Sequence, residues 1–89
     1  MAKGKQIKAL PTPDLAQPLS LKLIGDAIRA RRTQQRLDRK TAAMLCDVSV
    51  VTLGKIENAS AGVRMESVLK VMAALGIKMK IDPWENSDA

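Results

Sequence analysis

The stretch Arg39–Asn58, RKTAAMLCDVSVVTLGKIEN, decides the fold of this chain. It predicts a short helix over residues 39–46 with Asp38 as its N-cap, a tight turn, and a second short helix over residues 49–57 that Ser49 caps. One face of the first helix carries small residues, which let another helix approach closely. These residues are Ala42, Ala43 and Cys46. The pattern therefore predicts two short helices that cross at close range.

Two longer helices are predicted on either side of this stretch. The first covers residues 20–36 and begins at Ser20, a good N-cap, with Leu21, Ile24 and Ile28 on one face. The last covers residues 64–75 and ends before Gly76, a typical residue just past a helix C-terminus. Its buried side is expected to contain Met65, Val68, Val71, Met72 and Leu75.

The composition agrees with a small, mainly α-helical domain. The chain has 89 residues, 46% of them hydrophobic, with one Trp and no Tyr or Phe. A core of this composition must be aliphatic, and the many alanines favour closely packed helices over a β-sandwich.

The charge is unevenly distributed along the chain. The net charge is +6, and the Lys and Arg residues are concentrated in residues 1–40, where the local net charge is +7. A basic half joined to a nearly neutral half suggests a polyanionic partner. A solvated basic face is the alternative interpretation.

Several classes of function are poorly compatible with the residue inventory. The chain has no His and a single cysteine, Cys46, expected in the core, so the Ser-His-Asp and Cys-His schemes and the usual zinc sites are excluded. We therefore expect no enzyme activity, cofactor or metal. No apolar run reaches transmembrane length and no signal-peptide core is present, which predicts a cytoplasmic protein without a membrane partner.

The chain ends are expected to differ from the central domain. Residues 1–18 mix lysines with prolines and are predicted to be a flexible basic arm, either a disordered tail or a segment that follows DNA phosphates. The helical domain is placed at residues 19–76 and an acidic tail at residues 83–89.

A strand is predicted between that domain and the tail, within residues 77–82. Apolar and basic residues alternate there: Ile77, Lys78, Met79, Lys80 and Ile81. The chain offers no second strand candidate, so the expected partner is the same strand of another copy across a two-fold axis. The alternative is an extended tail packed on the domain.

The central segments resemble the Cro and phage-repressor type of helix-turn-helix protein, also called the XRE type. The matching segments are IRARR, LDRKTAA, VSVVTLGKIEN and VLKVMAALGI, between Ile24 and Ile77. The resemblance implies a domain that places its second short helix in the DNA major groove. It also implies a mostly buried ion pair between Arg32 and Glu57.

Three residues depart from the family pattern. Asp47 stands in place of the usual turn glycine, although Asp tolerates a left-handed backbone better than most residues. Arg39 occupies a position where Gln is common. Gly54 lies inside a helix, where it costs about 1 kcal/mol relative to Ala.

The strand at residues 77–81 adds a finer resemblance, to HipB-type antitoxins. These small repressors dimerise through a C-terminal strand pair and bind a HipA-type kinase toxin. The resemblance implies a homodimeric repressor that binds an inverted-repeat operator, autoregulates its operon and restrains a HipA-like toxin, in a bacterial cytoplasm near the nucleoid.

The resemblance also indicates which residues would contact DNA. On the second short helix these are Ser49, Val50, Val51, Thr52 and Lys55. Arg39, Lys40 and Thr41 are expected at phosphates on one side, and Asn58 and Arg64 on the other. The two valines can only pack against thymine methyl groups, unless one of them fills the helix crossing.

Trp84 is the sole aromatic residue and is a candidate anchor for the toxin, or alternatively a cap on the strand pair. Two other functions remain open. One is a phage or chromosomal regulator without a toxin, and the other is a protein-interaction module whose helix-turn-helix no longer binds DNA.

Overall fold

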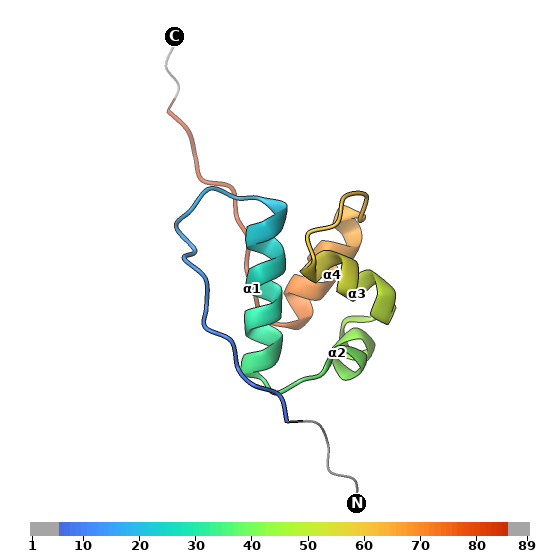
Figure 1. Ribbon diagram of the computed structural model, residues 1–89. Coiled ribbons are helices and arrows are strands. Elements are labelled where there is room, and N and C mark those ends of the chain that lie inside the picture. Colours follow the sequence, from blue (N-terminus) through green and yellow to red (C-terminus); the bar gives the residue numbers. More distant parts are fainter. Residues whose placement is uncertain (1–5, 86–89) are drawn as a thin grey trace, which may run out of the picture.

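The computed structural model describes residues 6–85 and shows four helices in that range. In chain order they are α1 (Leu21–Gln34), α2 (Arg39–Cys46), α3 (Val50–Glu57) and α4 (Met65–Ala74). Helix α1 stands on one side of the molecule, and α2, α3 and α4 pack together on the other (Figure 1). The four helices predicted from the sequence are confirmed, with ends that differ by two residues or fewer.

Side chains cap the first three helices where the sequence predicted. The hydroxyl of Ser20, the carboxylate of Asp38 and the hydroxyl of Ser49 each accept a hydrogen bond from a backbone N–H in the first turn. The turn between α2 and α3 is also confirmed, because Asp47 adopts the left-handed conformation with φ 59°.

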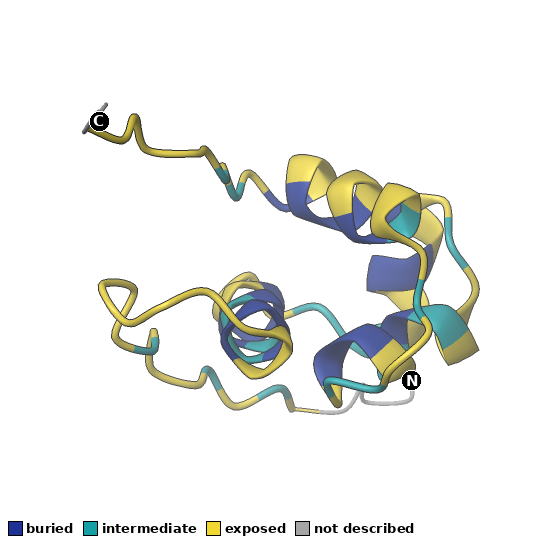
Figure 2. Ribbon diagram, turned by 90° about the horizontal axis from the view of Figure 1, so that it is seen from above, coloured by how far each residue is buried: buried dark blue, intermediate teal, exposed yellow. Residues whose placement is uncertain are grey.

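The core is aliphatic and lies where the four helices meet. Its largest fully buried side chains are Ile28, Leu53, Val71 and Leu75. Figure 2 shows the buried residues on the inward faces of the helices, with exposed residues on the outside. The small face of α2 is buried as predicted, Cys46 included.

The predicted burial of two residues is wrong. Leu21 and Met65 are exposed, whereas Leu23 is buried. Each of the two exposed residues is the first residue of its helix.

The backbones of α1 and α3 approach each other closely at Gly25. A Cβ atom at this position would lie 2.7 Å from the carbonyl oxygens of both Ile56 and Glu57. The two backbones therefore approach each other at a distance that only glycine permits. Gly54 is different, since a Cβ there would meet only Arg39, at 3.8 Å.

The segment after α4 is not a strand in this structure. Ile77 and Met79 are partly buried against the core, and Lys78 and Lys80 are exposed, so the predicted alternation is present. In the described part of the chain, however, the backbone of residues 78–81 makes no hydrogen bond to another backbone group. A strand requires a ladder partner, and a single chain supplies none here.

The segment before α1 runs back along this helix (Figure 1). The N–H of Leu10 donates to the hydroxyl of Thr33 at 3.0 Å, and the Gln34 amide donates to the Leu10 carbonyl at 2.9 Å. Residues 10–12 are thus held on the last turn of α1, whereas the sequence predicted a flexible arm over residues 1–18. Lys3 and Lys5 of the predicted basic arm, and residues 86–89 of the predicted acidic tail, lie outside the described residues.

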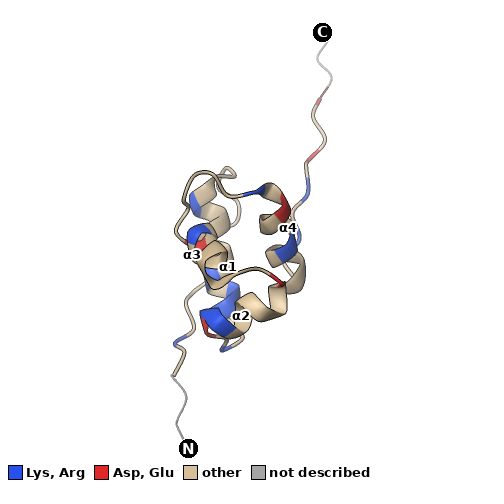
Figure 3. Ribbon diagram, turned by 90° about the vertical axis from the view of Figure 1, so that its right-hand side faces the viewer, with Lys and Arg blue, Asp and Glu red and all other residues tan. Residues whose placement is uncertain are grey.

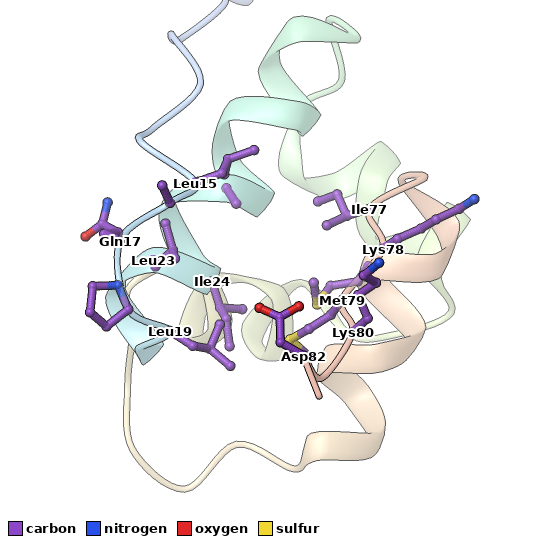
Figure 4. A pocket seen from close by; sticks show the side chains of 14 residues that line it. Leu15, Gln17, Leu19, Leu23, Ile24, Ile77, Lys78, Met79, Lys80 and Asp82 are labelled. Carbon is purple, nitrogen blue, oxygen red and sulfur yellow. The ribbon is translucent and has the colours of Figure 1, made fainter. Parts of the chain in front are cut away.

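A groove of about 670 Å³ separates the two terminal segments. Figure 4 shows Leu15 and Leu23 on one side of it and Ile77 and Met79 on the other. Its lining is mostly aliphatic, and it lies beside the segment for which a strand was predicted.

The two helical glycines give a matched pair of variants. Gly25→Ala should destabilise the protein by about 1–3 kcal/mol, because the added methyl group meets two backbone carbonyls that cannot move aside. Gly54→Ala should stabilise it by up to about 1 kcal/mol, because the methyl group has room and Ala favours the helix. Urea unfolding followed by circular dichroism measures both changes. Equal effects of the two variants would contradict the packing at Gly25.

Candidate nucleic-acid interface

A buried carboxylate connects α3, the centre of the candidate interface, to α1 and α2. The side chain of Glu57, at the end of α3, is fully buried and is approached by three arginines. Arg32 of α1 makes a bidentate contact, with Nε 2.6 Å from Oε2 and Nη2 3.0 Å from Oε1. Arg29 of α1 and Arg39 of α2 each place Nε near Oε1, at 3.3 and 3.2 Å. The structure thus brings the predicted pair together and adds two further cations to it.

The electrostatics of Glu57 follow from these contacts. Burial alone would raise its pKa, but hydrogen bonds and charge from Arg32, together with hydrogen bonds from Arg29 and Arg39, hold the pKa below its usual value of 4.5. Three guanidinium groups around one carboxylate also leave an excess of positive charge. Arg29 and Arg39 are partly exposed, so this excess reaches the surface.

The cluster fixes residues at the edge of the candidate interface. Arg29 Nη2 donates to Asn58 Oδ1 at 2.8 Å, which orients the Asn58 side chain at the end of α3. Arg39 reaches Glu57 by passing over Gly54. Two predicted phosphate contacts, Arg39 and Asn58, are therefore held by the same buried carboxylate. Arg29 is not among the site residues predicted from the sequence, although its spacing of three residues from Arg32 places both on one helical face.

No other part of the chain within residues 6–85 covers the outer surface of α3. Val50 is 46% exposed and Val51 is 66% exposed, so neither fills the crossing between α2 and α3. Lys55 is exposed one turn beyond Val51. Ser49 and Thr52 lie at the same surface and are hydrogen bonded to each other.

Basic side chains surround this surface. Lys40 and Thr41 are exposed in the first turn of α2, and Arg64 is exposed at the N-cap of α4. Figure 3 shows Lys and Arg on α2 and on α3 at the side that faces the viewer. The predicted DNA contacts in α2, α3 and the following loop therefore lie on neighbouring elements.

The other predicted sites lie apart from this surface. Helix α1 presents Gly25, Arg29 and Arg32 to α3, whereas Leu23 and Ala27 line the groove beside residues 77–80. The helical period of 3.6 residues puts these two sets on opposite faces of α1. Trp84, in the segment that continues from residues 77–81, is 81% exposed. The predicted dimerisation and toxin sites are thus separated from α3 by α1.

The described residues contain no group of three or more His, Cys, Asp or Glu side chains placed to hold a metal ion. None of the helices within residues 6–85 has both the length and the apolar character needed to cross a bilayer.

Comparison with known proteins assigns this geometry to a family. A family model described as helix-turn-helix matches residues 28–81, which is more than half of the chain. The match begins within α1 and extends to the end of the alternating segment. No curated protein matches the chain closely enough to count as a relative.

The buried carboxylate predicts a specific dependence of stability on pH. Because the pKa of Glu57 is lowered in the folded state, its stabilising contribution is complete above about pH 4.5 and is lost as the pH falls through the folded-state pKa. Glu57→Gln should lower the free energy of unfolding at pH 7 by about 3–5 kcal/mol, because the arginines lose their counter-charge. The difference from wild type should shrink between pH 5 and pH 3.

Glu85→Gln is the matched control, because Glu85 is exposed in the C-terminal segment. Chemical unfolding at several pH values measures all three proteins. A difference between Glu57→Gln and wild type that stayed constant down to pH 3 would contradict the role assigned to the carboxylate.

Proposed function

The chain belongs to the helix-turn-helix family of the XRE type, which is a family of DNA-binding regulators. We propose, because of this membership, that the protein is a sequence-specific transcriptional repressor. The observation that carries the proposal is the uncovered surface of α3. It lies between basic residues of α2 and the loop before α4, on a frame held rigid by the Glu57 cluster. Helix α3 would enter the major groove while α2 and Arg64 approach phosphates on the two sides.

The same surface argues against a module that has lost DNA binding. Lys40, Lys55 and Arg64 are all exposed around α3, and within the described residues none of them has an ion-pair partner. A surface used only for protein contacts has no need for a ring of unpaired cations, whereas phosphates neutralise them. The proposed site of action is the bacterial nucleoid.

The proposed repressor acts as a homodimer on an inverted repeat. The support lies in residues 77–81. Burial alternates over residues 77–80, the backbone of residues 78–81 makes no backbone hydrogen bond within the described part of the chain, and the segment borders an aliphatic groove. The same segment of a second copy would complete a two-stranded ladder and cover Ile81, which is 86% exposed. A two-fold dimer would present its two α3 helices to successive turns of DNA, about 34 Å apart.

A finer proposal is that the repressor is also the antitoxin of a HipA-like kinase and autoregulates the operon that encodes both. Trp84 favours this role, because it is the only aromatic side chain and is 81% exposed in the structure. It lies on the far side of α1 from α3, so a bound toxin would leave the DNA surface free. A phage or chromosomal regulator without a toxin is the simpler alternative.

DNA binding should depend steeply on salt. Each phosphate contact contributes about 0.9 to the slope of log affinity against log salt concentration. Lys40→Ala should lower the slope by about this amount per site, whereas Lys22→Ala should leave it unchanged. Lys22 is exposed on α1 and paired with Asp26, away from the interface. Fluorescence anisotropy with the protein's own promoter DNA measures the slopes, and identical slopes for the two variants would contradict the proposed orientation on DNA.

The antitoxin proposal predicts a separation of two activities. Trp84→Ala should weaken capture of the neighbouring gene product by at least tenfold, because an exposed aromatic anchor is lost. Affinity for promoter DNA should change less than twofold. Co-purification and anisotropy measure the two quantities. Loss of dimerisation and DNA binding in this variant would instead assign Trp84 to the strand pair.

A further inference from the structure

The surface of α3 has fewer free hydrogen-bond donors than its sequence suggests. Ser49 Oγ accepts a hydrogen bond from the Thr52 N–H at 3.0 Å and donates its own hydrogen to Thr52 Oγ1 at 2.9 Å. The hydrogen of the serine hydroxyl is therefore already used at the N-cap of α3, and the oxygen can only accept a further hydrogen bond. Of these two hydroxyl groups, only that of Thr52 retains a hydrogen to donate, and Thr52 is half-buried.

Two of the side chains that project from this surface are apolar. Val50 and Val51 are exposed at its N-terminal end and make no part of the core. Lys55 follows Val51 at a spacing of four residues, so it lies on the same face one turn away. The surface is thus an apolar patch next to a single cation, with further cations at Lys40 and Arg64 on neighbouring elements.

We propose that Val50 and Val51 determine specificity by packing against the C5-methyl groups of thymines in the major groove. This inference rests on the proposed DNA-binding function and names the feature of DNA that the surface recognises. Among the groups that base pairs expose in the major groove, the thymine methyl is the apolar one. Valine methyl groups can gain free energy from it only by excluding water.

The charges around the patch favour DNA over a protein as the occupant. A phosphate backbone runs on each side of the major groove, and cations flank the two valines on α2, on α3 and at the start of α4. The apolar patch therefore matches the thymine methyl groups of a major groove, and the surrounding cations match the phosphates on its two sides. The engaged Ser49–Thr52 pair leaves Lys55 as the main polar reader.

The test removes only the methyl groups from the DNA. The full chain first selects its site from a randomised duplex library, and each thymine of the selected half-site is then replaced by deoxyuridine. Deoxyuridine keeps every hydrogen-bonding group of thymine. At one or two positions the replacement should weaken binding about fourfold, the loss expected for one buried methyl group. Anisotropy titrations measure the affinities at constant salt.

Two variants and one control assign any loss to the valines. Val50→Ala and Val51→Ala should bind the thymine site more weakly, and each should lose most of the discrimination at one position. Leu69→Ala removes an equally exposed apolar side chain from α4 and should discriminate as wild type does. Thermal unfolding followed by circular dichroism should show that all three variants fold.

Two results would overturn the inference. One is that wild-type protein binds the deoxyuridine and thymine sites equally, and the other is that both valine variants retain the full discrimination. Either result would indicate that DNA shape is read instead. If binding remains specific and salt-dependent in either case, only methyl recognition fails. If the library yields no specific site, the proposed function fails with it.

Discussion

The burial of the Glu57 carboxylate constrains the rest of the domain. An ionised carboxylate can be buried only if it is paired, and its arginine partners come from α1 and α2. The end of α3 is therefore stable only when both of these helices are packed against it. Gly25 makes this arrangement possible, because it lets α1 approach the carbonyls of Ile56 and Glu57. The orientation of α3 is thus set by a charge on its inner side.

Features that depend on local sequence could be predicted without the structure. The caps at Ser20, Asp38 and Ser49 and the left-handed turn at Asp47 follow from residues within four positions, and the structure contains all of them. The aliphatic core follows in the same way from the helical period. Leu21 and Met65 are the exceptions, because periodicity identifies a helical face but not how far its neighbours extend along it.

Features that depend on the distance between segments could not be predicted. Nothing near Gly25 indicates that α3 approaches it, and Arg29 differs from a surface arginine only through its contacts with Glu57 and Asn58. The docking of Leu10 on Thr33 likewise joins residues that are far apart in the chain. The strand at residues 77–81 is a different case, since its formation depends on a second copy and stays a prediction.

The exposure of Val50, Val51 and Lys55 has an evolutionary consequence. Because these side chains contribute nothing to the core, replacing them should change stability by about 0.5 kcal/mol or less. Under the proposed function, mutations at these positions that alter which DNA is bound need no compensating mutation inside the protein. Duplicated copies of such a gene could then diverge in target sequence within a few substitutions, while the Glu57 cluster and Gly25 keep the fold unchanged.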